Sequence, residues 1–151
     1  MTLPEVCGIR IRLQLERNTR QLALFNLAID SKLQGCDLVS LQVRDVIHGS
    51  QAVKRATVIQ KKTGRPVQFE LTPHTRQAVE AWVSEAHLQP GSSLFPSRVH
   101  DSPHISTRQY AGIVKSWVTE LGLDPAVYGT HSLRRTKATL VYRRIRNLPC
   151  V

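Results

Sequence analysis

The stretch from Gly129 to Thr139 carries the residues whose types and spacing are best suited to chemistry. Thr130 is a good N-cap, and the apolar residues that follow it predict a helix packed on a core. His131 and Arg134 are three residues apart, so they share one face of this helix near its N-terminus. A proton donor, a guanidinium group and a helix N-terminus that point the same way form a site for an oxyanion. The pattern therefore favours a phosphodiester as the ligand.

The composition is that of a globular protein with a polyanionic partner. The chain has 151 residues, of which 41% are hydrophobic and 21% are charged, and this suits one ordinary domain with its own core. Its net charge of +10 favours phosphate backbones, which basic proteins bind by releasing counterions. Six of the Lys and Arg residues fall between positions 134 and 146. This clustering favours nucleic acid over a surface that is merely basic.

Apolar residues at helical spacing predict a mainly helical α+β fold around this stretch. Helices are expected at residues 2–17, 19–29, 73–88 and 108–121. Residues 34–46 predict a short helix that runs into a strand, and β-branched or alternating residues predict strands at 52–60 and 67–71. The expected sheet is therefore small, antiparallel and three-stranded, with the basic turn 61–66 between its last two strands.

Residues 92–106 are rich in Ser, Pro and His and predict a long surface loop that Leu94 and Phe95 tether to the core. His100, Asp101 and His104 lie in this loop without a Cys or a second acidic ligand, so no metal site is expected. No internal repeat or second domain is recognisable, and we expect no cofactor.

The cysteine usage favours a cytoplasmic protein. Cys7, Cys36 and Cys150 have no paired spacing, and an odd number of cysteines fits a reducing compartment better than secretion. No apolar run approaches the roughly 20 residues that cross a bilayer, and the N-terminus lacks the apolar segment of a signal peptide. We therefore expect no membrane association.

The nine residues His131-Ser132-Leu133-Arg134-Arg135-Thr136-Lys137-Ala138-Thr139 resemble the H-x-L-R-H/R-T-x-A-T box of the tyrosine recombinases, the phage integrase family. In that family a Tyr attacks DNA and forms a 3′-phosphotyrosine, while two Arg and a His bracket the phosphate and a hairpin Lys protonates the leaving 5′-oxygen. The resemblance implies an integrase catalytic-domain fold, DNA integration or site-specific recombination as the activity, and origin in a mobile element. Double-stranded DNA is the implied partner, and full-length integrase protomers are candidate further partners.

The resemblance implies catalytic roles for three residues of this chain. Arg134 is similar to the second Arg of the family, His131 to the neighbouring His, and Lys62 to the hairpin Lys, so we expect these three to meet around one phosphate. Arg suits its position because a guanidinium fork chelates two phosphate oxygens, which a Lys does less well. Lys61 is the fallback for the hairpin Lys, and both lysines have the alternative of a solvated turn charge. Further DNA contacts are expected from Lys61, Arg65, Arg135 and Lys137.

Residues 33–46 are similar to the first box of the family, roughly L-R-x-x-E/D-L-x-x-L-x-x-x-D-I/V. Asp37 matches the acidic position and is expected to orient neighbouring catalytic groups. Gln34 stands where the family has its first Arg. Because a neutral amide donates hydrogen bonds but does not neutralise a phosphate, we expect this degenerate position to cost several kcal/mol of transition-state stabilisation.

The chain also departs from the family pattern after the His131 box. The Leu-x-Gly-His segment and the nucleophilic Tyr are not found before the last residue, and Tyr142 comes too early to be that nucleophile. Tyr110 and Tyr128 precede the box and are expected in the core or at its rim. No helical DNA-clamping, core-binding domain precedes the box either. We therefore expect residues 1–151 to be a single, C-terminally truncated catalytic domain.

Four hypotheses about function follow from these departures. The first is a truncated family member that keeps the fold and a basic DNA-facing surface but does not cut DNA alone. The second is a recombinase that borrows its Tyr from a partner in trans, against which Gln34 counts. The third is a non-catalytic DNA-binding module that occupies integrase sites or poisons integrase assemblies. The fourth is a decayed integrase remnant without a selected role.

Overall fold

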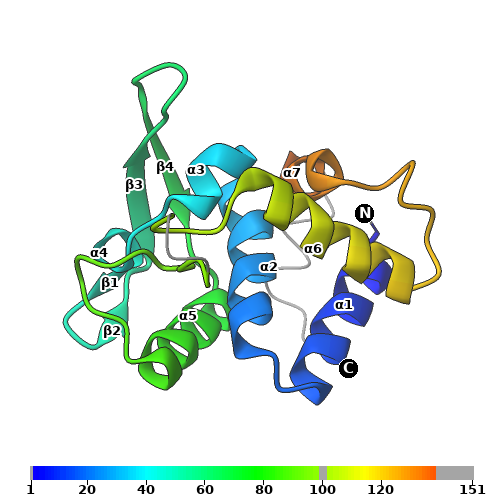
Figure 1. Ribbon diagram of the computed structural model, residues 1–151, viewed down its shortest axis with the longest axis horizontal. Coiled ribbons are helices and arrows are strands. Elements are labelled where there is room, and N and C mark those ends of the chain that lie inside the picture. The colour runs from blue at the N-terminus through cyan, green and yellow to red at the C-terminus, as the bar shows by residue number, and fades with distance from the viewer. Residues whose placement is uncertain (1, 99–101, 139–151) are drawn as a thin grey trace.

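Helices make up most of the computed structural model, which describes residues 2–98 and 102–138 and, for residues 3 and 135–138, the backbone alone. The helices are α1 (Leu3–Leu15), α2 (Thr19–Ser31), α3 (Gly35–Val39), α4 (Val43–Val46), α5 (Pro73–Ala86), α6 (Thr107–Glu120) and α7 (Thr130–Ala138). The strands are β1 (Ile47–His48), β2 (Gln51–Ala52), β3 (Arg55–Ile59) and β4 (Pro66–Glu70). The expected mainly helical α+β fold is confirmed (Figure 1).

α2 is the central helix, and the other helices gather around it. Its residues from Ala23 to Ser31 are all buried, as expected for a helix that is apolar on most sides. α1, α5 and α7 pack against α2, and Phe25 of α2 meets Trp117 of α6 edge-on, with ring centroids 5.3 Å apart. The core therefore extends from α2 to helices on each side of it.

Side-chain caps determine where several helices begin. Thr2 and Glu5 form a capping box at α1, and Ser106 and Gln109 form another at α6. Asn18 accepts the Gln21 N–H at the start of α2. Each cap satisfies backbone N–H groups that have no partner within the helix, which is why these helix starts were predictable to within a residue or two.

The strands form two separate hairpins, in place of the single three-stranded sheet that the sequence predicts. β1 pairs with β2 around a turn in which Gly49 has φ of 67°, and β3 pairs with β4. The expected strand 52–60 divides between Val53 and Lys54. The Val53 N–H donates to the Val46 carbonyl at 2.9 Å, in register with the first hairpin, whereas the Lys54 carbonyl accepts the Leu71 N–H at 2.8 Å, in register with the second. The chain therefore passes from one hairpin to the other at this point.

Residues 34–46 form α3 and α4, in place of the expected helix that runs into a strand. Asp45 accepts the Gln42 N–H at 2.8 Å, and this capping contact begins a second short helix where β structure was expected. Leu38, Leu41, Val43 and Val46 are all buried, so the inward side of this segment was predicted correctly although its conformation was not.

A buried carboxylate joins α5 to the end of α2. Asp30, which has an exposed fraction of 0%, accepts hydrogen bonds from the Thr72 N–H at 2.8 Å and the Thr72 hydroxyl at 3.0 Å. The loop after α5 is anchored as expected, since Leu94 and Phe95 are fully buried. Trp82 adds a hydrogen bond from Nε1 to the Leu94 carbonyl at 2.7 Å.

None of the described helices is long and apolar enough to cross a membrane. Cys7 is disulfide-bonded, whereas Cys36 has a free thiol. The cytoplasmic location expected from the cysteine usage stays a prediction.

Candidate phosphate-binding site

A cavity of about 440 Å³, which we call the first cavity, lies between α3, α6, α7 and the turn of the β3–β4 hairpin. In Figure 1, α3, the first part of α6 and α7 lie along the upper side of the molecule, and the β3–β4 hairpin projects beside α3. The polar residues of its lining are Gln34, Cys36, Lys62, Thr107, Tyr110, Thr130, His131 and Arg134. No Asp or Glu is among the described residues that line the cavity, so the charge of its described lining is positive. The structure thus brings Lys62, His131 and Arg134 together, with Gln34 beside them.

α7 carries His131 and Arg134, and its position is fixed by packing against the core. Leu133 is fully buried within the hydrophobic core, while His131 is exposed and Arg134 is partly exposed on the cavity side. Arg134 Nε donates to the carbonyl of Lys32 at 3.3 Å, and Lys32 ends α2 with φ of 56°. Because this bond uses Nε, the two terminal guanidinium nitrogens can donate to the oxygens of a phosphate.

The start of α7 differs by one residue from the prediction. Thr130 is the first helical residue and lines the cavity, although the sequence predicts it as the N-cap. The preceding residue, Gly129, donates its N–H to the buried Ser132 hydroxyl at 3.1 Å. A contact between these two residues therefore closes the turn that brings His131 to the cavity.

Lys62 comes to the same cavity from an exposed turn of the β3–β4 hairpin. In this turn Gly64 has φ of 67°, a conformation that glycine adopts without strain. Thr63 supports the turn on both sides, since its hydroxyl donates to Gln60 Oε1 at 2.9 Å and accepts the Arg65 N–H at 3.2 Å. The backbone of the turn is thus ordered by its own side chains.

Asp37 connects the first cavity's α3 wall to this hairpin. Its side chain is almost fully buried, and Oδ1 accepts the N–H of Lys61 at 3.0 Å. Its Oδ2 is buried with no hydrogen-bond partner among the described residues. Since Lys61 immediately precedes Lys62, the carboxylate fixes the backbone next to a cavity residue. This is the geometry that the expected orienting role requires.

Tyr110 is a lining residue that the sequence reasoning assigned only to the core or its rim. It has an exposed fraction of 3%, and burial raises the pKa of its hydroxyl above the ordinary value. Its ring lies against Gly35, where a Cβ would meet ring Cδ2 at 3.5 Å, an ordinary van der Waals contact. Tyr110 reaches the cavity through the packing of α6 against α3, and no local signal in the sequence could have shown this.

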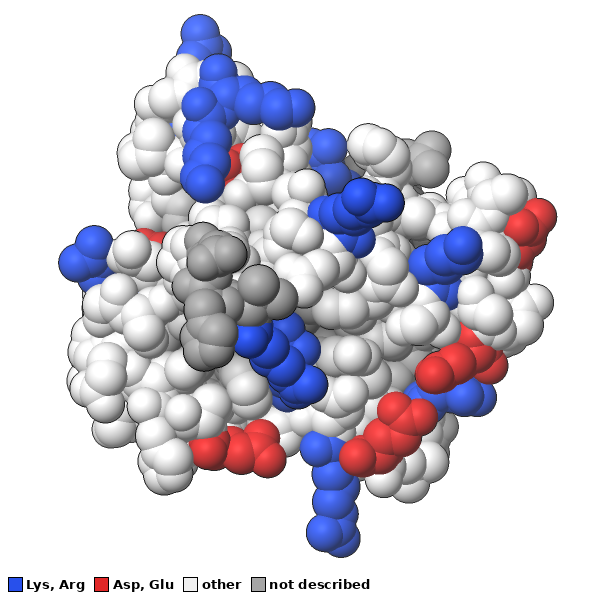
Figure 2. All heavy atoms as spheres, in the orientation of Figure 1, with Lys and Arg blue, Asp and Glu red and all other residues white. Residues whose placement is uncertain are grey.

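Two of the other predicted DNA contacts, Lys61 and Arg65, are not among the described residues that line the first cavity. Lys61 and Arg65 are exposed on the hairpin turn, and Lys61 lines a neighbouring cavity together with Asp37. Arg135 and Lys137 belong to α7, but their side chains lie outside the described part of the chain. Figure 2 shows Lys and Arg over the projecting hairpin, whereas most of the visible Asp and Glu lie along the lower and right edges.

Residues 2–98 and 102–138 contain no group of three or more His, Cys, Asp or Glu side chains that could hold a metal ion. His100 and Asp101 lie outside this part of the chain, as does Tyr142.

A sequence model of the phage integrase family matches residues 11–151, whereas a comparison with curated proteins finds no match. The fold is similar to the crystal structure of XerA recombinase, with a TM-score of 0.77, 16% identity, and coverage of 95% of this chain and 49% of that one. It is also similar to XerH site-specific recombinase bound to its difH substrate, with a TM-score of 0.69, 18% identity, and coverage of 95% and 43%. The integrase from mycobacterium phage Brujita gives a TM-score of 0.68, 16% identity, and coverage of 93% and 43%.

At these identities the structural likeness shows the fold, and this chain spans less than half the length of each of the three recombinases. The family assignment rests on the sequence match, which extends over nearly the whole chain and includes the His131–Arg134 segment and the Gln34–Asp37 segment. The chain belongs to the phage integrase family.

Proposed function

We propose that this chain binds duplex DNA and holds one backbone phosphate in the first cavity, between Lys62, His131 and Arg134. The observation that carries the proposal is the convergence of these three side chains, from segments far apart in the sequence, on one cavity without a carboxylate in its lining. XerH, a structural neighbour, is bound to a DNA substrate, which supports DNA as the source of the phosphate.

Each side chain has a distinct task in this proposal. Arg134 is oriented by the Lys32 carbonyl and can chelate two non-bridging oxygens with its terminal nitrogens. His131 and Lys62 donate from the two sides of the cavity, and the N-terminus of α7 adds partial positive charge. Asp37 acts through the backbone of Lys61 and so positions the hairpin without touching the DNA.

Strand cleavage is the reaction that the family resemblance implies, and we propose that the described residues support it poorly. Gln34 brings a neutral amide to the cavity at the position of the family's first Arg, so negative charge that develops on the phosphate is stabilised less. Tyr110 lines the cavity, but its raised pKa keeps the hydroxyl protonated. A buried neutral phenol suits hydrogen-bond donation to a phosphate better than nucleophilic attack. We therefore propose phosphate binding without cleavage, unless a partner supplies the nucleophile.

A salt titration of duplex binding tests the first part of this proposal. Lys62→Ala and Arg134→Ala should each weaken binding, and the double substitution should lower the slope of log affinity against log salt concentration by about one, the change expected when one phosphate contact is lost. Arg44→Ala removes an exposed Arg from α4 and serves as the matched control, with a smaller expected effect. If the wild-type chain does not bind duplex at low salt, the proposal is wrong.

A nicked duplex that traps covalent protein–DNA adducts tests the second part. We expect no adduct from this chain alone. An adduct that persists through denaturation would show a working nucleophile and contradict the cleavage part, while leaving the binding part to the salt titration.

A further inference from the structure

Arg20 and Arg98 face a second cavity, of about 390 Å³, on another side of α6. We call it the second cavity. α6 forms a wall of both cavities, because Thr107 and Tyr110 line the first cavity whereas Gln109 and Ile113 line the second. The remaining residues of the second lining are uncharged: Ile105, Gly112 and Ser116.

Among the described residues, the two guanidinium groups of the second cavity have no acidic partner. Within the described part of the chain, neither Arg20 nor Arg98 makes an ion pair or a side-chain hydrogen bond, in contrast to Arg12 with Glu120 and Arg55 with Glu70. Arg20 is also partly buried, and a partly buried cation without an acceptor destabilises the fold.

Three effects act on Arg20 in the same unfavourable direction. Burial lowers the pKa of its guanidinium, and the charge of Arg98 lowers it further. Arg20 also lies in the first turn of α2, where the helix dipole is positive and disfavours a cation. An anion placed between Arg20 and Arg98 would relieve all three effects at once.

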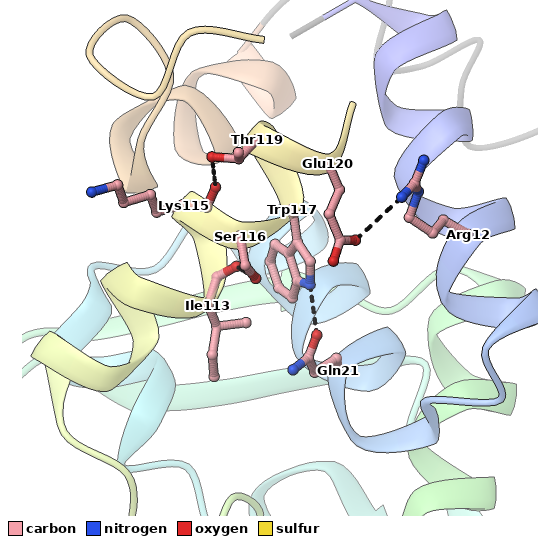
Figure 3. Close-up of polar contacts among 8 residues, drawn as sticks. All are labelled: Arg12, Gln21, Ile113, Lys115, Ser116, Trp117, Thr119 and Glu120. Atoms are coloured by element: carbon pink, nitrogen blue, oxygen red, sulfur yellow. Dashed lines mark hydrogen bonds and ion pairs between the residues drawn. The ribbon is translucent and has the colours of Figure 1, made fainter. Parts of the chain in front are cut away.

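Contacts with α6 fix the part of α2 that carries Arg20. Trp117 Nε1 donates to Gln21 Oε1 at 2.8 Å, so the residue after Arg20 is tied to α6 (Figure 3). Glu120 pairs with Arg12 of α1 at 3.6 Å, and Figure 3 shows both contacts along the C-terminal half of α6. The backbone that carries Arg20 is therefore preorganised relative to the cavity.

Polar groups around the pair also suit an oxyanion. The Gln109 Oε1 accepts the Ser106 N–H at 2.9 Å, so its amide NH₂ can donate to a ligand. With two guanidinium groups, the second cavity offers several N–H donors and two positive charges around a space that admits a small tetrahedral anion.

We propose that the second cavity is a phosphate-binding site, formed by Arg20 and Arg98, and that it holds a second backbone phosphate when the chain is on DNA. The identification of DNA as the source rests on the proposed function above. α6 lines both cavities and is about 10 Å across with its side chains. A polyanion with closely spaced phosphates, as duplex DNA is, is therefore the ligand that suits two phosphate sites on this one helix.

The first arm of the test uses inorganic phosphate and thermal unfolding. All proteins in this arm carry Lys62→Ala and Arg134→Ala, so that the first cavity does not contribute. Phosphate should raise the Tm of this parent relative to chloride at equal ionic strength. Adding Arg20→Gln and Arg98→Gln should remove most of that shift, whereas adding Arg44→Gln should preserve it. In chloride the Arg20→Gln/Arg98→Gln protein should be at least as stable as the parent, because a repulsive pair has been neutralised.

The second arm measures duplex binding in the otherwise wild-type chain. Arg20→Gln with Arg98→Gln should lower the salt slope by about one, the change expected when one phosphate contact is lost. Arg44→Gln should leave the slope nearly unchanged. Arg98→Gln alone repeats both arms if the double substitution fails to fold, since Arg98 is an exposed loop residue.

Each combination of results decides a different point. A selective phosphate shift without any duplex binding by the wild type supports the second site and overturns the proposed function. A selective phosphate shift with an unchanged salt slope supports a site for free phosphate and rules out DNA as its source. A change of slope without a phosphate shift supports a site for phosphate within DNA. Equal responses of the substituted and control proteins in both arms overturn the second site.

Discussion

The α7 wall and the hairpin wall of the first cavity are held in place by different kinds of interaction. On α7, the fully buried Leu133 fixes the helix, and the Lys32 carbonyl orients Arg134. On the hairpin, Lys62 lies in an exposed turn, and the Asp37–Lys61 hydrogen bond of 3.0 Å connects that turn to the body of the fold.

This difference predicts that, in the proposed DNA complex, the α7 wall is rigid before the DNA binds and the hairpin wall can adjust. A helix packed through a buried leucine moves only when the core opens, whereas an exposed turn held by few contacts opens locally at a lower free energy. Arg134 is therefore suited to setting the position of the phosphate, and Lys62 to closing on it. The predictions below test this division of labour.

Leu133→Ala should have the largest effect. It removes a fully buried side chain and leaves a cavity under α7, so the free energy of unfolding should fall by about 2–5 kcal/mol. Denaturant unfolding measures this directly. Leu15→Ala is the matched control, because Leu15 is 80% exposed and its loss should change stability by less than about 0.5 kcal/mol. Similar losses for the two variants would show that α7 is not held by packing.

Asp37→Ala should loosen the hairpin without loosening α7. The substitution leaves the Lys61 N–H without its acceptor, which costs about 1–3 kcal/mol, whereas Asp37→Asn keeps an acceptor oxygen and should cost less. Hydrogen exchange should speed up at Lys61 and its neighbours in the Ala variant, while α7 keeps its protection. Equal acceleration in both walls would contradict the distinction drawn between them.

Gln34→Arg should strengthen DNA binding by adding a cation to the first cavity. A further cation at the same phosphate should raise the affinity at low salt by roughly tenfold and make the affinity fall more steeply with salt concentration. Duplex titration at several salt concentrations measures both quantities. Gln89→Arg adds the same charge at an exposed position outside this cavity and controls for net charge. If both variants bind alike, Gln34 does not face the bound phosphate.

Tyr110 should produce a small loss of stability at high pH. Its folded-state pKa is raised by burial, so the unfolded chain loses the phenol proton first. The stabilisation is complete below the unfolded pKa of about 10 and declines as pH rises above it. At about pH 10.5 the loss should be roughly 0.8 kcal/mol. Unfolding measured at several pH values should show this loss in the wild type relative to Tyr110→Phe, and parallel pH profiles would mean that Tyr110 is not buried.

The sequence predicted those parts of the site that depend on local spacing. The three-residue interval between His131 and Arg134 places both on one helical face, and the turn residues around Gly64 place Lys62 at a hairpin turn. The meeting of these two segments was expected from the family resemblance and is seen as a shared cavity. Their functional roles stay predictions.

Features that depend on contacts distant in the sequence could not be predicted. Arg20 and Arg98 are far apart in the sequence and belong to no motif that links them. The packing of α2, α6 and the loop before α6 brings them to one cavity. The change of hairpin between Val53 and Lys54 was missed because Val53 is β-branched and favours a strand, as β3 does. Only the different hydrogen-bond partners, Val46 for Val53 and Leu71 for Lys54, show where the chain passes from one hairpin to the other.

The division of the strands into two hairpins affects the tendency of this chain to self-associate at high concentration. Because β3 and β4 form a sheet of their own, the outer edge of each strand has no neighbouring strand within the described part of the chain, and such edges favour pairing between molecules. Ile59, which is 62% exposed on β3, would favour this self-association. Lys61 lies in the turn after β3, and Arg65 lies directly before β4. Both place positive charge where a second hairpin, with the same charges, would approach. The residues suited to attracting DNA would thereby also keep two hairpins from joining edge to edge.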